Sequence, residues 1–126
     1  MQKLIGAIIK KGDKVLVERR KDSDDFGGGE LWVIGGHVEK DETEEDAFVR
    51  EVKEELDIVP LEYKQVCVLP WVRDGKQYSV TYFAFDRWKG NIKNKEAEKL
   101  IWLSKKEINK LDVDIDKKAL KLCFRN

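Results

Sequence analysis

The run LWVIGGHVEKDETEEDAFVREVKEELDIVP, residues 31–60, constrains the fold more than any other part of the chain. It opens with a short apolar segment that ends in two glycines, which predicts a β-strand leading into a loop. Thr43, with Asp46 three residues later, is typical of a helix N-terminus. The apolar residues that follow recur at helical spacing; they are Phe48, Val49, Val52 and Leu56. The run therefore predicts a strand, a loop and an amphipathic helix in succession.

The segments around this run predict the rest of an α/β domain. Residues 3–11 and 14–20 are β-rich and flank a Gly-Asp pair, so we expect a hairpin. A second hairpin is expected around the DGK turn. Further along the chain we expect a short strand and two short helices; these segments are 100–104, 104–111 and 114–124. Strands and helices that interleave in this way, with antiparallel hairpins among them, indicate one α/β domain with a mixed sheet over residues 1–126.

Composition excludes several classes of function. Lys and Arg number 25 and Asp and Glu also number 25, so no overall field attracts nucleic acid or an anionic membrane. No apolar run approaches the roughly 18 residues of a membrane-spanning helix, and the N-terminal segment is typical of a strand rather than of a signal peptide. The two cysteines, Cys67 and Cys123, are expected to be free thiols. We therefore expect a cytoplasmic protein with a small-molecule partner.

Three glutamates of the expected helix share one face. At ~100° per residue, Glu51, Glu54 and Glu55 lie within one turn of one another, beside the apolar stripe. Carboxylates this close raise one another's pKa unless a cation compensates, and hard oxygen ligands favour Mg²⁺ or Mn²⁺. Taken alone, the segment favours a solvated glutamate-rich helix with an ordinary Arg50–Glu54 ion pair, because such strings are common.

The flanking residues decide between these interpretations. Gly-x5-Glu-x7-Arg-Glu-U-x-Glu-Glu-x-Gly-U, with U aliphatic, is the Nudix box, and the chain resembles the Nudix hydrolases in this pattern and over nearly its whole length. The matching residues span 36–58; they are Gly36, Glu42, Arg50, Glu51, Val52, Glu54, Glu55 and Ile58. Asp57 stands where the family has glycine, and Ile34 where many relatives have proline. Aspartate tolerates the left-handed conformation expected there better than most residues, so we expect the helix to end at this turn at some cost in stability.

The resemblance implies a fold and a set of roles. The fold would be an α/β/α sandwich around a mixed sheet, with the box forming loop, helix and loop. Gly36, Glu51, Glu54 and Glu55 would hold a divalent metal, while Arg50 and Glu42 would support the box. Gly35 and His37 are candidates for substrate binding, although a lone histidine is more often structural. Either Glu54 or an acid in the KEAEK loop would be the general base; Glu98 is our first choice there and Glu96 the second, with solvated loop charges as the alternative.

The expected activity follows from the resemblance to the MutT-like branch of the family. It is hydrolysis of a (deoxy)nucleoside triphosphate to the monophosphate and pyrophosphate. A nucleotide-sugar hydrolase is the alternative, weakened because Asp74 stands where ADP-ribose enzymes often carry proline. A non-catalytic nucleotide sensor is a third possibility, although such domains usually lose box carboxylates. One aromatic residue among Trp32, Trp71, Tyr82 and Trp88 is expected to stack on the base, and the protein is expected to be a monomer or a homodimer.

Overall fold

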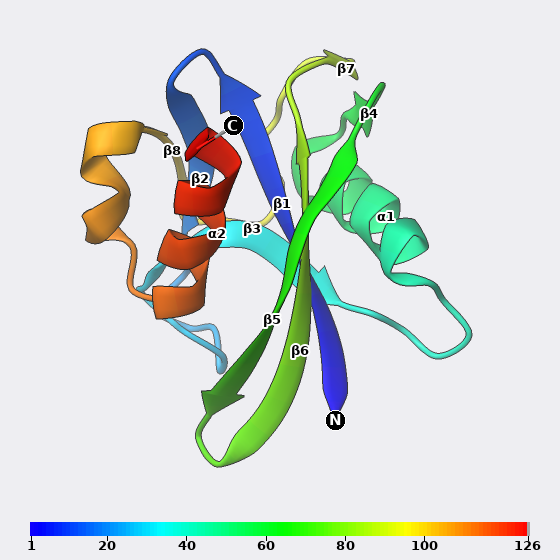
Figure 1. The fold of residues 1–126 in the computed structure, drawn as a ribbon, viewed down its shortest axis with the longest axis vertical. Helices are drawn as coiled ribbons and strands as arrows, with labels where there is room; N and C mark the ends of the chain where they lie inside the picture. Colours follow the sequence, from blue (N-terminus) through cyan, green and yellow to red (C-terminus); the bar gives the residue numbers. More distant parts are fainter. Residues whose placement is uncertain (126) are drawn as a thin grey trace.

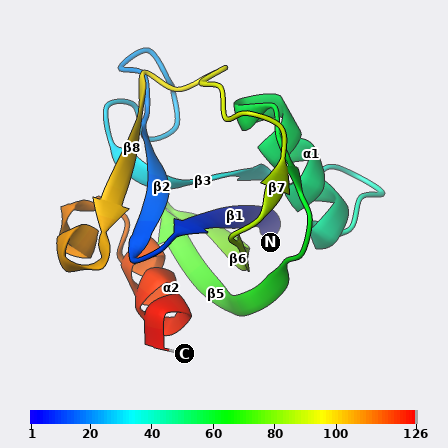
Figure 2. The same ribbon diagram turned by 90° about the horizontal axis from the view of Figure 1, so that it is seen from above.

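A computed structural model describes residues 1–125, so the expected domain end at residue 126 lies outside the described residues. A six-stranded sheet forms the middle layer, and helices α1 (Glu44–Leu56) and α2 (Asp114–Arg125) cover its opposite faces (Figures 1 and 2). This arrangement confirms the expected α/β/α sandwich. The strands of the main sheet are β1 (Gln2–Lys11), β2 (Lys14–Arg19), β3 (Leu31–His37), β5 (Lys64–Arg73), β6 (Lys76–Phe85) and β8 (Lys99–Ser104).

Strand pairing makes the sheet mixed, as the sequence predicts. The order is β5-β6-β1-β3-β2-β8, and β1 pairs parallel with β6 while the other neighbours are antiparallel. Both expected hairpins form, and their turns use residues at positive φ: Gly12 in the first, Asp74 and Gly75 in the second. The sheet therefore brings the ends of β2 and β3 next to the helix that follows β3.

Two apolar clusters, one on each face, hold the helices against the sheet. On one face Phe48, Val52 and Leu56 of α1 pack against strand residues such as Leu16 and Ile34. The other cluster joins α2 to the alternate residues of the same strands, including Leu4, Val33 and Tyr82. Residues at even positions of β2 thus face α1 and residues at odd positions face α2, which is the period-2 alternation of a strand covered on both sides.

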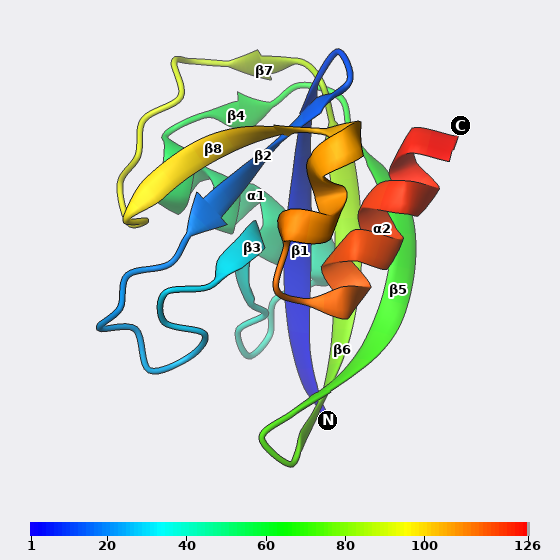
Figure 3. The ribbon, with the colours of Figure 1, turned by 90° about the vertical axis from the view of Figure 1, so that its left-hand side faces the viewer.

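Two details differ from the sequence-based expectation. Residues 105–110 form a 3₁₀-helix, η1 (Lys105–Lys110), in which the Ser104 backbone N–H donates to the Glu107 carboxylate at 3.1 Å. It lies beside α2 on the same face (Figure 3). Strands β4 (Val59–Pro60) and β7 (Trp88–Lys89) add a small separate sheet that short apolar patterns do not reveal. Among residues 1–125, no helix is long and apolar enough to cross a membrane.

Candidate active site

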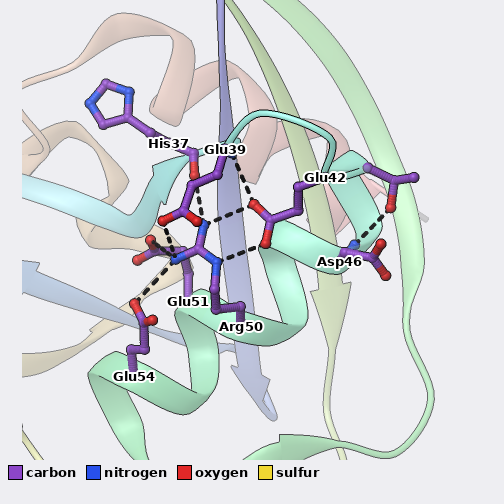
Figure 4. A network of polar contacts seen from close by, with 8 residues as sticks. His37, Glu39, Glu42, Asp46, Arg50, Glu51 and Glu54 are labelled. Carbon is purple, nitrogen blue, oxygen red and sulfur yellow. Dashed lines mark hydrogen bonds and ion pairs between the residues drawn. The ribbon is translucent and has the colours of Figure 1, made fainter.

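The glycine pair and the acidic helix form one continuous loop–helix unit. Thr43 caps α1, because its hydroxyl oxygen accepts a hydrogen bond from the Asp46 backbone N–H at 3.0 Å. Arg50 lies at the centre of the unit (Figure 4). Its guanidinium donates to Glu42 at 2.8 and 3.0 Å and to the His37 carbonyl at 2.9 Å, so it ties α1 to the loop after β3. These hydrogen bonds hold the pKa of Glu42 well below its usual range, at about 2.

Arg50 also contacts two of the three candidate metal-binding glutamates. Its Nη1 donates to Glu51 at 2.7 Å and to Glu54 at 3.2 Å. The Glu51 side chain is 14% exposed and the Glu54 side chain 50%, so the two differ sharply in their contact with water. Burial raises the pKa of Glu51, although the guanidinium opposes this. One arginine therefore balances part of the negative charge on this helix face.

Gly36 lies directly against the Glu51 carboxylate. A Cβ added at this position would overlap the carboxylate carbon and both of its oxygens. Gly35, next to it, is more strictly restricted, since a Cβ there would overlap the Ile5 carbonyl oxygen on β1, which is backbone. Close packing therefore requires glycine at position 35, whereas a side chain at position 36 would displace the Glu51 carboxylate from its place.

Glu55 is buried beneath the helix and has a neighbour that sequence reasoning missed. Its residue is 8% exposed, and its Oε2 has no hydrogen-bond partner among the described residues. The neighbour is Glu18 of β2, 4% exposed. Burial raises the pKa of Glu55, and the negative charge of Glu18 raises it further; burial also raises the pKa of Glu18, opposed by Arg20. The available signal was strand alternation, because Glu18 is in phase with the buried Leu16.

The loop before β8 approaches the same carboxylates through Glu96. The charge of this exposed residue raises the pKa values of Glu18, Glu51 and Glu55. The Glu98 side chain makes no hydrogen bond or ion pair with the box within residues 1–125; its backbone N–H donates to the Arg19 carbonyl at 2.9 Å. Glu96, the second choice from the sequence, thus affects the box carboxylates through its charge, whereas Glu98, the first choice, makes no side-chain hydrogen bond or ion pair with them in the described residues.

The donor set fits a divalent cation. Within residues 1–125, no three acidic, histidine or cysteine side chains converge at metal-ligand distances, and Arg50 donates to both Glu51 and Glu54. The unpartnered Oε2 of Glu55, the Gly36 backbone in contact with Glu51, and the purely oxygen chemistry of the acids nevertheless suit a hard divalent ion. A buried carboxylate oxygen without a donor is costly unless a cation or water satisfies it.

A cavity of about 170 Å³ opens on the other face of the sheet, between the sheet and α2. Aromatic side chains form much of its wall: Phe26 lies 5.1 Å from Trp32 and 5.7 Å from Trp71, measured between ring centroids. The Arg20 guanidinium lies over the Trp32 ring at 4.5 Å and also lines the cavity. Trp32 and Trp71 are thus the expected aromatic residues that reach the cavity, and Tyr82 lines its floor.

Asp116 is the buried acid of this cavity. Its carboxylate accepts hydrogen bonds from the Tyr82 hydroxyl at 2.5 Å and from the Val33 backbone N–H at 3.0 Å. Burial raises the pKa of Asp116 to about 6, against the lowering effect of these two donors. Its burial could not be predicted from the sequence, because Asp116 follows Asp114 at the start of a helix, where acids are common.

The segment 35–37 joins the cavity to the box. Gly35, Gly36 and His37 all line the cavity, while Gly36 also contacts Glu51 and the His37 carbonyl accepts from Arg50. The His37 ring is stacked on Phe26 with a centroid distance of 6.1 Å. A ligand that fills the cavity and extends past these residues would place its far end at the box carboxylates.

The helix ends as expected despite the departure at position 57. Asp57 adopts the left-handed conformation, with φ 59° and ψ 37°, and its backbone N–H donates to the Lys53 carbonyl. Its carboxylate pairs with Lys53 at 2.9 Å and Lys93 at 3.5 Å, and these lysines lower its pKa. Asp57 therefore has a structural role.

Comparison with known proteins agrees with this geometry. The NUDIX domain family model matches residues 2–123. A CTP pyrophosphohydrolase of Escherichia coli (strain K12) is 31% identical over 108 residues, covering 85% of this chain and 78% of that protein. The 8-oxo-dGTP diphosphatase of the same organism is 28% identical over 104 residues, covering 82% and 80%. A MutT protein from Methanosarcina mazei shares the fold, with a TM-score of 0.85 at 20% identity over 98% of this chain and 93% of that one.

A mixed sheet between two helical layers, in which a glycine-containing loop leads from β3 into the acidic helix on one face, defines a hydrolase fold of the Nudix type. The chain belongs to the Nudix family.

Proposed function

We propose that this protein hydrolyses (deoxy)nucleoside triphosphates to the monophosphate and pyrophosphate, and that residues 1–126 belong to one Nudix hydrolase domain. The observation that carries this proposal is the segment 35–37, which borders both the aromatic cavity and the carboxylate cluster. A base in the cavity and a phosphate chain at the box would then belong to one extended ligand. The relatives named above, which act on CTP and 8-oxo-dGTP, support a triphosphate substrate.

In this proposal Glu51, Glu54 and Glu55 hold Mg²⁺ or Mn²⁺ together with the Gly36 backbone. The bound ion would supply charge neutralisation at the diphosphate oxygens and a lower pKa for the attacking water. Arg50 keeps Glu51 and Glu54 oriented through its hydrogen bonds to both. Glu42 in turn fixes the guanidinium, so these two residues act through the glutamates rather than on the substrate.

The proton of the attacking water needs an acceptor. Glu54 suits this role because its side chain is half exposed and its ion pair with Arg50 is longer than that of Glu51. The water oxygen forms a new bond to a phosphorus of the α–β linkage, the bridging P–O bond breaks, and the proton passes to the carboxylate. The alternative proton acceptors are Glu98 and Glu96 in the loop before β8. Glu96 is the better candidate of these two, because its charge acts on the box glutamates Glu51 and Glu55.

The cavity favours bases that carry an exocyclic amino group. Each Asp116 oxygen already accepts one hydrogen bond but retains a second lone pair, so this acid can accept further donors and cannot donate when ionised. Guanine, cytosine and adenine present such donors, whereas thymine and uracil present only one ring N–H. Phe26, Trp32 and Trp71 supply aromatic surfaces for stacking.

A substrate panel tests the proposal. Purified protein is incubated with Mg²⁺ or Mn²⁺ and each of the common and oxidised triphosphates, together with ADP-ribose and GDP-mannose, and products are separated by ion-exchange chromatography. We expect monophosphate and pyrophosphate from triphosphates, faster with bases that carry an exocyclic amino group than with thymine or uracil, and no turnover in EDTA. Faster turnover of a nucleotide sugar would favour the alternative hydrolase, and binding without turnover of any compound would favour a nucleotide sensor.

A further inference from the structure

We propose that Glu18 of β2 is a fourth carboxylate of the divalent-cation site, contributed from outside the loop–helix box. The inference rests on the cation site of the proposed function and extends it to a strand that the box does not include. Glu18 would act through its charge and its contact with Glu55, which makes it a positioning residue for the cation-binding glutamates.

The position of Glu18 in β2 points its side chain at α1. Leu16, two residues earlier, belongs to the apolar cluster under α1, whereas Val15 and Val17 belong to the cluster under α2. The Glu18 side chain is 5% exposed and lies against Glu55, which descends from the helix toward the strand. Two buried acids, one from β2 and one from α1, therefore meet between the strand and the helix.

The two buried acids, Glu18 and Glu55, have too few hydrogen-bond donors and cations beside them to offset their negative charge. Glu18 Oε1 is paired with Arg20 Nη1 at 3.3 Å, while Glu55 Oε2 has no hydrogen-bond partner within residues 1–125 although the residue is 8% exposed. A buried carboxylate beside a second carboxylate is unfavourable without a donor or a cation aimed at it. The unpartnered oxygen is thus an independent sign of a missing ligand in this acidic cluster.

The ion pair with Arg20 does not by itself explain why an acid stands at position 18. Arg20 is also held by the Phe26 carbonyl, at 2.8 Å from Nε, and by Asp24 at 3.8 Å, and its guanidinium stacks on Trp32. The arginine would therefore keep its place beside the cavity without Glu18. A carboxylate buried next to Glu55 is instead explained if a cation lies between α1 and β2, because its charge then helps to hold that cation.

The test measures binding of the cation directly and does not depend on turnover. Mn²⁺ is titrated into the metal-free protein, and the free ion is followed by its electron paramagnetic resonance signal. We expect Glu18→Gln to raise the Kd for Mn²⁺ by about tenfold or more. Melting curves recorded in EDTA and in saturating Mn²⁺ give a second readout, and the rise in Tm caused by Mn²⁺ should be smaller in the variant.

Glu30→Gln is the matched control, because Glu30 is likewise paired with an arginine, Arg73, at 2.8 Å, but within residues 1–125 its side chain contacts Arg73 and Trp32 and none of the box glutamates. Its Kd for Mn²⁺ should equal that of the wild type. A wild-type Kd for Mn²⁺ in Glu18→Gln would overturn the inference and leave the proposed function standing. The same holds if the substitution lowers Tm by the same amount with Mn²⁺ as in EDTA. A wild-type protein that binds no Mn²⁺ would instead overturn the cation site itself. If Glu18→Gln does not fold, Glu18→Asp is titrated, and an unchanged Kd there overturns the inference.

Discussion

Arg50 donates hydrogen bonds to both carboxylate oxygens of Glu42, at 2.8 and 3.0 Å. The same guanidinium reaches the His37 carbonyl on the strand side and Glu51 and Glu54 on the helix side. A two-point pair of this kind fixes both the position and the plane of the guanidinium. The loop between β3 and α1 is therefore closed by one arginine whose remaining donors orient the candidate metal-binding glutamates.

Glu42→Gln should lower kcat/KM by roughly 10- to 100-fold, because the amide cannot accept both guanidinium donors and Arg50 loses its fixed orientation. Initial rates measured over a range of Mg²⁺ concentrations should show that part of the loss is recovered at high Mg²⁺. Glu44→Gln, two residues further on at the start of α1 and paired within residues 1–125 only with Lys3, is the control and should retain wild-type rates. Equal rates in Glu42→Gln and the wild type would contradict the supporting role of Glu42.

Glu55→Gln should reduce turnover by at least about 100-fold while the circular dichroism spectrum stays unchanged. The substitution preserves side-chain volume but removes a buried charge that the proposed cation requires. In the metal-free state the variant should melt at a higher temperature than the wild type, since burial and the nearby Glu18 charge disfavour the ionised carboxylate. Glu45→Gln, on the exposed side of the same helix, should change neither quantity.

The order of elements and the box could be predicted because both depend on patterns local in the sequence. The period of the apolar residues in 44–56 and the turn residues at Gly12 and Gly75 reflect backbone geometry that acts over a few residues. Asp57 shows the same point, because the left-handed conformation predicted for it is adopted. The 3₁₀ form of 105–110 and the β4–β7 pair depend on tertiary packing and were not predictable.

The site was predicted where its residues share one helix and was missed where they meet across the sheet. Glu51, Glu54 and Glu55 follow from helical spacing alone. Glu18 reaches Glu55 only because β2 lies beneath α1, and Asp116 reaches Tyr82 only because α2 covers the opposite face. Asp116 looks like an ordinary acid at a helix start, and although the alternation of β2 puts Glu18 on the same face as Leu16, only the folded chain shows which groups the two buried acids meet.

Trp71→Ala should raise KM for a nucleoside triphosphate by roughly 10- to 100-fold with a smaller effect on kcat, because a stacking aromatic contributes about 1–3 kcal/mol to binding a base. Trp71 is half-buried at the cavity wall beside Phe26, so its removal leaves the main sheet intact. Trp88→Ala is the matched control, since Trp88 packs on the α1 face near Phe85 and away from the cavity. A KM shift of equal size in both variants would contradict base binding in the cavity.

Asp116→Asn should change how stability depends on pH. Burial raises the pKa of Asp116 to about 6 from its ordinary value of 3.8, so the folded state binds a proton that the unfolded state releases between these values. The stabilising contribution of this proton is complete below about pH 4 and is lost as the pH rises through about 6, a loss of order 3 kcal/mol. Asparagine does not titrate, and it can still accept from Val33 while donating to the Tyr82 oxygen.

Urea unfolding of the wild type and of Asp116→Asn at pH 4, 5, 6 and 7 provides the measurement. The difference in unfolding free energy between the two proteins should shift in favour of the variant as the pH rises from 4 to 7. Tyr82→Phe serves as the companion variant, because it removes the hydroxyl that donates to Asp116. The pKa of Asp116 should then rise further, and stability should be lost at a higher pH than in the wild type. A difference that is constant across this range would contradict the raised pKa of the buried acid.

Asp57→Ala should lower Tm by roughly 2–8 °C, whereas Asp57→Gly should melt at or above the wild-type temperature. The residue is in the left-handed conformation at the end of α1, which alanine adopts at a cost and glycine adopts freely. The ion pairs that Asp57 makes are with two exposed lysines, Lys53 and Lys93, at the protein surface, so their loss in either variant has little effect. Differential scanning calorimetry measures both shifts. Because Asp57 lies outside the proposed metal-binding set, kcat at saturating substrate should match the wild type in both variants, and a large fall in kcat for Asp57→Gly would show that this acid takes part in the reaction.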